Sequence, residues 1–297
     1  MKRLLSIILA ALCMAALVSC GSTETDNGEY NILTSFNPIY ALTLRIADGA
    51  ENVKVENMAA PSTGCLHDYQ LTTADMMKLS KSDIFIINGG GMESFMEKAM
   101  QASDNINVLD TSAGIEMLPS TGGHDGSEYN SHIWLSISNA KKQAENIRNG
   151  LVAENPENKG IYEKNTADFL NELEELDNEY KTSLDGVSGK VISFHEGIIY
   201  LLGGYGIEVT EIIETEPGVS PDPSTLAEII EDVKSSGIHV IFTEPQYPDS
   251  TAQVISRETG AEIYTLNPLV TGEMSRDSYV TIMRENLQVI VSALKQQ

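Results

Sequence analysis

The sequence predicts an α/β protein made of two similar lobes, each a mainly parallel sheet flanked by helices, joined by one long bridging helix. Short apolar segments alternate with amphipathic helical segments, and this alternation occurs once in each half of the 297-residue chain. Between the halves lies a long helical pattern that lacks glycine and proline after Gly160. Alternation of strands and helices indicates parallel sheets, because each parallel crossover needs a connecting helix.

The first half contains four segments that we interpret as strands. Asp83–Ile87 is apolar after its first residue and runs into three glycines, which is typical of a strand buried on both faces. The other strands are predicted at Ile32–Thr34, Val53–Met58 and Val108–Leu109, and helices at Pro38–Ala50, Thr73–Leu79 and Met92–Ala102. We assign residues 30–150 to an N-terminal lobe.

The second half repeats this pattern, and we assign residues 187–297 to a C-terminal lobe. Strands are predicted at Val191–Phe194, Val209–Ile213, Val240–Phe242 and Glu262–Leu266, and helices at Ser224–Ser235, Ser250–Thr259 and Arg276–Leu294. Two such halves imply two α/β lobes.

Residues 155–186 are predicted to form the bridging helix. Asn155 is expected to be its N-cap and Pro156 its first helical residue. Apolar side chains recur there at helical spacing, at Leu170, Leu173, Leu176, Tyr180 and Leu184. A helix of about 25 residues is ~37 Å long, which is enough to run along two lobes. The alternative is an ordinary surface helix of one lobe.

The first 29 residues have the pattern of a bacterial lipoprotein leader. Lys2 and Arg3 precede an uncharged apolar run that is too short to be a permanent membrane span, so residues 1–19 are predicted to be a signal peptide. The run ends in Leu-Val-Ser-Cys-Gly, a pattern typical of cleavage before Cys20 and attachment of a lipid to its thiol. Residues 20–29 are small, polar and acidic, as expected of a flexible tether.

We therefore expect the protein to be held by a lipid on the outer face of the bacterial cytoplasmic membrane. Acylation contributes membrane affinity of ~0.8 kcal/mol for each buried methylene group. The alternative is a plain secretory signal in which Cys20 has no role.

The composition argues against a nucleic-acid-binding protein. The chain has 19 Lys and Arg against 43 Asp and Glu, and loss of Lys2 and Arg3 with the signal peptide would change the net charge from −24 to −26. Phosphate recognition depends on basic side chains, so nucleic acid should be repelled.

Cys13 and Cys20 belong to the leader, which leaves Cys65 alone and excludes an intramolecular disulfide in the folded body. We expect a monomer.

Three of the five histidines are candidates for a metal site. His195 directly follows a predicted strand, and ligands in open α/β sheets bind beyond the carboxyl ends of strands. His67 lies in the loop after another strand, and His132 in the polar connection that follows the last strand of the first lobe. They are far apart in sequence, so no short ligand motif exists. Taken singly, each such histidine is more often a hydrogen-bonded structural residue than a ligand.

Five sequence blocks occur in an order and at spacings that resemble the zinc/manganese solute-binding proteins of ABC importers, the group that includes the ZnuA-like lipoproteins. The blocks are Cys65-Leu66-His67-Asp68-Tyr69, Asn130-Ser131-His132-Ile133-Trp134-Leu135-Ser136, Ser193-Phe194-His195-Glu196-Gly197, Phe242-Thr243-Glu244-Pro245-Gln246 and Leu266-Asn267-Pro268-Leu269. The resemblance extends from Ile32 to the final helix. It implies that a metal ion is held between two α/β lobes and passed to a membrane permease.

The resemblance places His67, His132 and His195 on the three main ligand positions of that family. Manganese-type relatives tend to have glutamate where this chain has His195, and imidazole suits Zn²⁺ better than Mn²⁺, so we expect Zn²⁺ as the transported ion. Asn267 stands where the family commonly has aspartate. The fourth ligand is therefore Asn267, a water or a nearby carboxylate such as Glu196.

Two further residues near these blocks have weaker claims to a metal. Cys65 could supply a soft thiolate ligand, although a small buried residue is the simpler interpretation. His124 lies where zinc-type relatives often carry a loop rich in His, Asp and Glu, and its role in capturing metal would be auxiliary.

Other functions remain open at this point. The importer could carry Mn²⁺ or Fe²⁺ instead of Zn²⁺. Three histidines and an open fourth position would also suit a zinc-dependent hydrolase, with Glu196 as the general base, although no oxyanion hole is evident and we expect no enzyme activity. A surface adhesin with a structural metal would hold its ion until unfolding.

Overall fold

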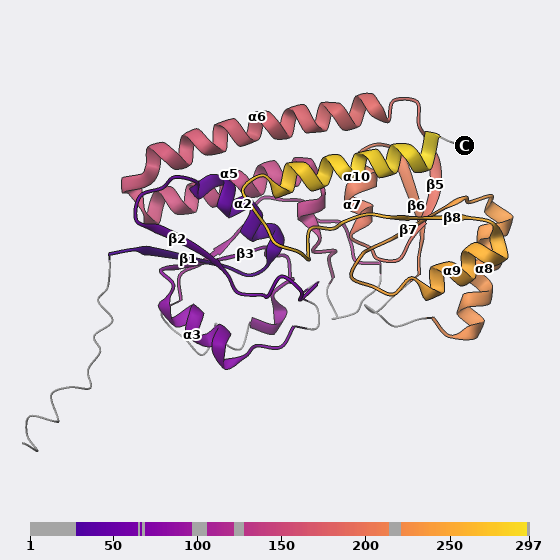
Figure 1. Ribbon diagram of the computed structural model, residues 1–297, viewed down its shortest axis with the longest axis horizontal. Helices are drawn as coiled ribbons and strands as arrows, with labels where there is room; N and C mark the ends of the chain where they lie inside the picture. The colour runs from indigo at the N-terminus through magenta and orange to yellow at the C-terminus, as the bar shows by residue number, and fades with distance from the viewer. Residues whose placement is uncertain are drawn as a thin grey trace, which may run out of the picture.

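The computed structural model describes residues 28–64, 66, 69–96, 106–121, 128–213 and 221–295, and these residues form two α/β lobes (Figure 1). Each lobe contains a four-stranded sheet, with strand orders β2-β1-β3-β4 and β6-β5-β7-β8. All neighbouring strands are parallel. The two lobes therefore have the same topology, and the predicted fold class is confirmed.

The eight predicted strands are all present in the described part of the chain. Their bounds are β1 Tyr30–Thr34, β2 Val53–Asn57, β3 Ile84–Ile87, β4 Val108–Asp110, β5 Gly189–Ser193, β6 Ile207–Ile212, β7 Val240–Thr243 and β8 Glu262–Thr265. In both sheets the order places the first and third strands of the lobe side by side at the centre. The carboxyl ends of these central strands carry the loops that position the site.

The helices are α2 Asn37–Ala47, α3 Thr73–Lys81, α5 Ile137–Glu154, α6 Lys159–Ser183, α7 Ile198–Gly203, α8 Pro223–Ser236, α9 Ser250–Thr259 and α10 Ser278–Lys295, with 3₁₀ turns η1 Ser94–Met96, η2 Ile133–Leu135 and η3 Pro156–Asn158. Local signals set several of these bounds. Thr72 and Asp75 form a capping box at the start of α3. The side chain of Asp222 caps α8, and Gly237 ends that helix in the left-handed conformation that glycine favours.

Successive residues of the central strands pack into different cores because side chains alternate across a strand. Ile32 and Val191 face one large core that α2, α5, α6 and α10 cover and that extends through both lobes. Leu33 faces a small core beneath α3, and Ile192 faces another beneath α8 and α9. In Figure 1, α6 runs along the top of both lobes with α10 beneath it, while α3 and α8 lie on the opposite side. The lobes thus share one hydrophobic core on the face that α2, α5, α6 and α10 cover.

The bridging segment differs from the prediction at its start. Pro156–Asn158 is a 3₁₀ turn, and the α-helix itself spans Lys159–Ser183. Asn155 ends α5 instead of capping the next helix, and its side-chain oxygen accepts hydrogen bonds from Asn158 and Tyr162. The predicted apolar stripe is buried at four positions and half-buried at Leu170. A helix along both lobes is thus present with the expected length of 25 residues, and it begins and ends inside residues 155–186.

Two helices, α5 and α7, were not predicted from the sequence, and one predicted helix needs correction. Of the helix predicted from Met92 to Ala102, the described residues contain only the 3₁₀ turn Ser94–Met96, and residues 97–105 lie outside the described part of the chain.

The chain crosses between the lobes a second time, after β8. The side chain of Asn37 on α2 donates to the carbonyl oxygens of Val270 and Gly272, and Gly272 N–H donates to the carbonyl oxygen of Pro61. Trp134 Nε1–H also donates to the carbonyl oxygen of Pro268, at 2.8 Å. This second crossover ties the C-terminal lobe to the N-terminal lobe beside the site.

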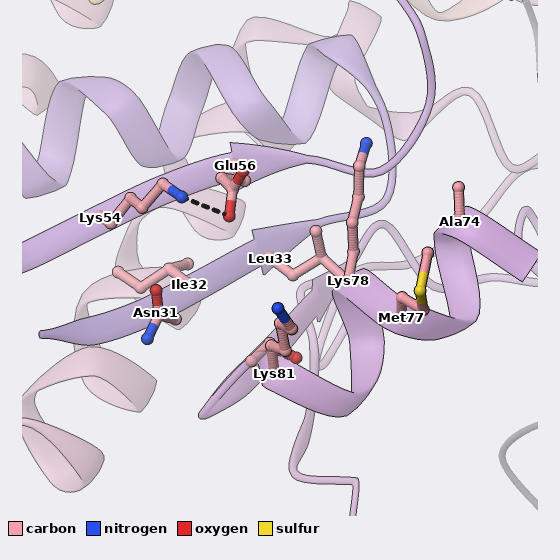
Figure 2. A pocket seen from close by; sticks show the side chains of 10 residues that line it. Asn31, Ile32, Leu33, Lys54, Glu56, Ala74, Met77, Lys78 and Lys81 are labelled. Atoms are coloured by element: carbon pink, nitrogen blue, oxygen red, sulfur yellow. Dashed lines mark ion pairs between the residues drawn. The ribbon is translucent and has the colours of Figure 1, made fainter. Parts of the chain in front are cut away.

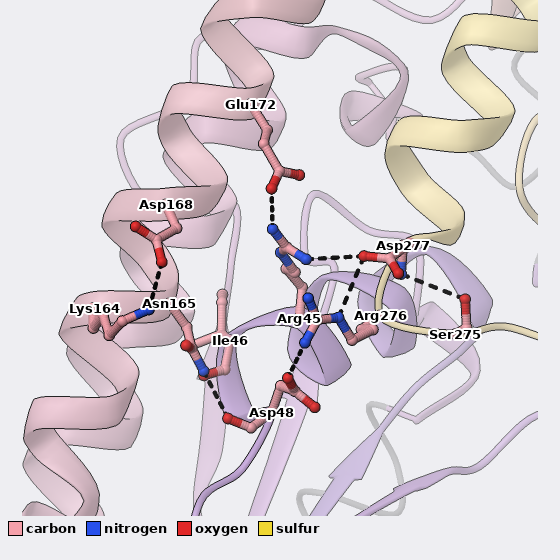
Figure 3. A network of polar contacts seen from close by, with 10 residues as sticks. All are labelled: Arg45, Ile46, Asp48, Lys164, Asn165, Asp168, Glu172, Ser275, Arg276 and Asp277. Atoms are coloured by element: carbon pink, nitrogen blue, oxygen red, sulfur yellow. Dashed lines mark hydrogen bonds and ion pairs between the residues drawn. The ribbon is translucent and has the colours of Figure 1, made fainter.

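An ionic network joins α2, α6 and the turn before α10 (Figure 3). Arg45 is buried and donates to the carboxylates of Glu172 and Asp277. Arg276, which is half exposed, pairs with Asp48 and Asp277. The network fixes the second crossover against the bridging helix.

Among the described residues, we find no helix that combines the length and the apolar composition needed to cross a membrane.

Candidate metal centre

The structure places His195 beyond the carboxyl end of a central strand, as predicted. β5 ends at Ser193, whose hydroxyl donates to the carbonyl oxygen of His195 at 3.0 Å and accepts from its N–H at 3.3 Å. These two contacts hold the turn that carries the imidazole. The His195 residue is only 5% exposed, so its ring lies inside the molecule.

The ring of His132 lies against the ring of His195. The two ring centroids are 4.4 Å apart and the planes are nearly perpendicular, at 86°. His132 is 1% exposed and immediately precedes η2. Two of the three predicted ligands, which are 63 residues apart in the chain, are thus brought together.

Close packing against α7 supports this arrangement. Gly197, next to the start of α7, lies so near His132 that an added Cβ would be 3.1 Å from Cγ of its ring. A residue larger than glycine would therefore press on the imidazole.

Each imidazole has an oxygen acceptor near its Nδ1 atom. His132 Nδ1 is 2.9 Å from Oδ1 of Asn130, and His195 Nδ1 is 3.5 Å from Oε1 of Glu244. Gly197 N–H donates to Nδ1 of His195 at 3.4 Å, so Glu244 lies within ion-pair distance of this ring without a hydrogen bond to it. In His132 the oxygen of Asn130 holds the proton on Nδ1, which leaves Nε2 of the neutral ring with its lone pair for a metal ion.

Glu244 is a site residue to which the sequence analysis gave no role. It follows β7, the neighbour of β5 in the sheet, and is 2% exposed. Gln246 Nε2 donates to one of its oxygens at 2.5 Å, while Oε1 has no hydrogen-bond partner among the described residues. In the sequence, the signal that could have indicated this role is a glutamate that stands between an apolar strand and a proline.

The Glu196 carboxylate accepts hydrogen bonds from two residues of another segment. It accepts from the hydroxyl of Ser120 at 3.2 Å and from N–H and hydroxyl of Thr121 at 2.8 and 3.0 Å. Glu196 therefore binds the segment that precedes His124 in the sequence.

Asn267 lies at the start of the second crossover. Its Oδ1 accepts the N–H of Leu269 at 2.9 Å, and its backbone exchanges two hydrogen bonds with the side chain of Asn286. The next residue, Pro268, is bonded to Trp134, two residues from His132. The side-chain oxygen of Asn267 thus closes a turn near the histidines and keeps one lone pair for another contact.

His67, Cys65, His124 and Cys20 lie outside the described residues, so their predicted roles stay predictions. Of the loop around His67, Gly64 is described, and a Cβ there would lie 3.9 Å from Cγ of Gln246. Gly64 therefore lies close to the residue that binds Glu244. Within the described ranges, no group of three or more His, Cys, Asp and Glu side chains could hold a metal ion.

The described surface also has a hollow of about 370 Å³ between β1, β2 and α3 (Figure 2). Lys54, Lys78 and Lys81 line it, and the Lys78 amine donates to the carbonyl oxygens of Asn57 and Met58. None of His132, His195 and Asn267 lines this hollow, so it is separate from the described part of the candidate metal centre.

The family profile described as zinc-uptake complex component A, periplasmic (ZnuA), matches residues 32–293. The chain belongs to this family. The family resemblance inferred from the five sequence blocks is thereby confirmed.

Similar proteins include metal-binding lipoproteins of several bacteria. The chain is 30% identical over its whole length to the zinc-binding lipoprotein AdcA of Streptococcus pneumoniae, of which it spans 62%. It is 27% identical to the high-affinity zinc uptake system protein ZnuA of Bacillus subtilis, with 99% of this chain and 98% of that protein covered. It is also 26% identical to the manganese ABC transporter substrate-binding lipoprotein PsaA of Streptococcus anginosus, with 99% of each covered.

Similar solved structures have the same fold. The protein FpvC of Pseudomonas aeruginosa in complex with Mn²⁺ matches with a TM-score of 0.82 at 26% identity, covering 90% of this chain and 99% of that one. Zn(II)-bound AdcA of Streptococcus pneumoniae matches with a TM-score of 0.78 at 28% identity, covering 91% of this chain and 59% of that one.

Proposed function

We propose that this protein binds Zn²⁺ outside the cytoplasm and delivers it to the membrane permease of an ABC-type importer. The observation that carries the proposal is the pair of buried imidazoles, His132 and His195, with ring centroids 4.4 Å apart between the two lobes. Family membership supports a role in metal uptake. The relatives named above as zinc-binding support Zn²⁺ as the ion.

The proposed ligands are His67, His132 and His195, with Asn267 or a water in the fourth position. Imidazole nitrogen is a favourable ligand for Zn²⁺, and neutral ligands leave the bound ion more exchangeable than a closed set of thiolates would. The closeness of Gly64 to Gln246 supports an approach of the His67 loop to the second lobe. His124 would act as an auxiliary capture residue.

The lipid on Cys20 would keep the protein beside its permease. We propose that residues 1–19 are removed and that Cys20 is acylated, which places the folded lobes on the outer face of the cytoplasmic membrane. Mass spectrometry of the mature N-terminus tests this, and an unmodified Cys20 would contradict it.

Competition titration with a chromophoric chelator tests zinc binding. His132→Ala or His195→Ala should weaken Zn²⁺ binding by orders of magnitude, because each removes a ligand that no neighbouring histidine replaces. His239→Ala is the matched control, since His239 is exposed just before β7 and should leave the affinity unchanged. Trp134, the only tryptophan in the chain, gives a fluorescence readout because its ring centroid is 5.2 Å from that of His132.

The second candidate is an importer of Mn²⁺ or Fe²⁺, which the resemblance to the manganese lipoprotein PsaA favours. Direct competition between Zn²⁺ and Mn²⁺ decides between them, and tighter binding of Mn²⁺ would refute the zinc assignment. Membership of an uptake family argues against a zinc-dependent hydrolase, so zinc-loaded protein should not turn over esters, phosphates or peptides.

A further inference from the structure

We propose that Asn130 and Glu196 form a clamp beside the metal centre, which selects the ligating tautomer of His132 and joins His132 to the segment that carries His195. Both are positioning residues in this proposal, and Glu196 is not the fourth metal ligand. The proposal rests on the proposed metal site. Part of its test is independent of metal binding.

The side chain of Asn130 bonds to both histidine segments at once. Its Oδ1 lies 3.1 Å from the backbone N of His132 and 2.9 Å from Nδ1 of the ring, while its Nδ2 donates to the carbonyl oxygen of Glu196 at 3.0 Å. Asn130 is completely buried. One amide thus connects the residue that follows His195 to the ring and backbone of His132.

The donors and acceptors around this amide fix its orientation. The backbone N–H of His132 can only donate, and the carbonyl oxygen of Glu196 can only accept. A flipped amide would face a donor with a donor and an acceptor with an acceptor. Oδ1 therefore faces the imidazole, and Nδ1 must carry the proton to form the 2.9 Å hydrogen bond. In the neutral ring, Nε2 of His132 is then unprotonated and able to bind a metal.

The carboxylate of Glu196 closes the other half of the clamp. It accepts hydrogen bonds from Ser120 and Thr121, so it faces this segment. Residues 117–121 and 128–131 pair as two arms, through Ser120 N–H to the carbonyl oxygen of Glu128 and Asn130 N–H to that of Leu118.

Tyr200 on α7 adds a third connection between the clamp and the second lobe. Its hydroxyl donates to the carbonyl oxygen of Asn130 at 2.9 Å and accepts from the N–H of Leu118 at 2.9 Å. Both arms are thus held on the segment from His195 to Tyr200.

This arrangement has a consequence for metal release. His132 comes directly after one arm and His195 directly before Glu196, so moving the two imidazoles apart requires breaking the clamp. Loss of a residue that orients a metal ligand typically lowers metal affinity by about 10- to 100-fold. We expect most of this loss as faster dissociation, because the clamp opposes separation of the two ligands.

Stopped-flow transfer of Zn²⁺ from the full chain to an excess of chelator measures the dissociation rate. Asn130→Ala and Glu196→Gln should each raise this rate by about 10- to 100-fold, with a much smaller change in the association rate. Asn130→Asp keeps an acceptor for Nδ1 but loses the donor to Glu196, so it should speed dissociation while preserving the His132 tautomer. Glu128→Gln is the matched control, because it removes the same charge from an exposed position on one arm.

Long-range ¹H–¹⁵N NMR of the metal-free protein reads the tautomer directly. His132 should be protonated at Nδ1 in the wild type and should be a mixture of tautomers in Asn130→Ala. An unchanged tautomer and an unchanged dissociation rate in that variant would overturn the proposal. Loss of an oxygen ligand from the zinc X-ray absorption spectrum of Glu196→Gln would overturn it too, by making Glu196 a ligand.

The two proposals can fail separately. If the wild type binds no metal, the proposed function fails, whereas the tautomer measurement still decides whether Asn130 orients His132.

Discussion

The buried carboxyl group of Glu93 should make the stability of the protein depend on pH. Glu93 accepts N–H hydrogen bonds from Asn88 and Gly89 at 2.8 and 3.0 Å, which favour its charged form. Burial outweighs these bonds and raises the pKa of Glu93 from 4.5 to about 7. The folded protein therefore holds a proton on this group, between about pH 4.5 and pH 7, that the unfolded chain has already lost.

Where the folded state binds more protons than the unfolded state, proton linkage makes the free energy of unfolding decrease as the pH rises. Raising a pKa from 4.5 to about 7 corresponds to about 3 kcal/mol, since one pKa unit is worth ~1.36 kcal/mol. Above pH 7, Glu93 should therefore destabilise the fold by about this amount relative to its protonated form.

Urea unfolding followed by Trp134 fluorescence measures the effect in the wild type and in Glu93→Gln. The free energy of unfolding of the wild type minus that of the variant should fall by about 3 kcal/mol from pH 4 to pH 8. Taking the difference cancels the other titrating groups that both proteins share. Glu285→Gln is the control, because Glu285 is exposed on α10. A difference between wild type and Glu93→Gln that stays constant or grows with pH would refute the reasoning.

Two further predictions concern the contacts that join the lobes. Arg45→Ala should lower the free energy of unfolding by about 2–3 kcal/mol, because it removes a buried guanidinium with two charge-assisted hydrogen bonds. Arg276→Ala, at a half-exposed position, should lower it by less than about 1 kcal/mol. Equal losses for the two variants in urea unfolding would contradict this prediction. Gly197→Ala should weaken Zn²⁺ binding by about 10-fold or more, because the added Cβ would press on the ring of His132. Gly203→Ala is the control, since a Cβ there meets no atom within 4 Å, and it should bind Zn²⁺ normally in the same titration.

Much of the fold was predictable because its signals are local. Each central strand is a short apolar run. These runs alternate with helices in both halves of the chain, and this alternation implies parallel sheets. The missed helix α5 lacked a comparable signal. Its buried face is built partly from Ala140 and Ala144, and Leu109 packs so closely on its Gly150 that an added Cβ would lie 2.4 Å away. Small residues of this kind indicate close packing only when the neighbour is known.

The sequence by itself determined the two α/β halves, the long helix between them, the lipoprotein leader pattern and the placement of His195 beyond a strand end. These features depend on residues within a few positions of one another. Only the tertiary structure decided that His132 lies against His195, that Glu244 reaches Nδ1 of His195, and that Asn130 connects the two histidine segments. These contacts span 49 to 66 residues and arise when strands pair within a sheet and two sheets pack under one shared core, and no spacing along the chain encodes that packing.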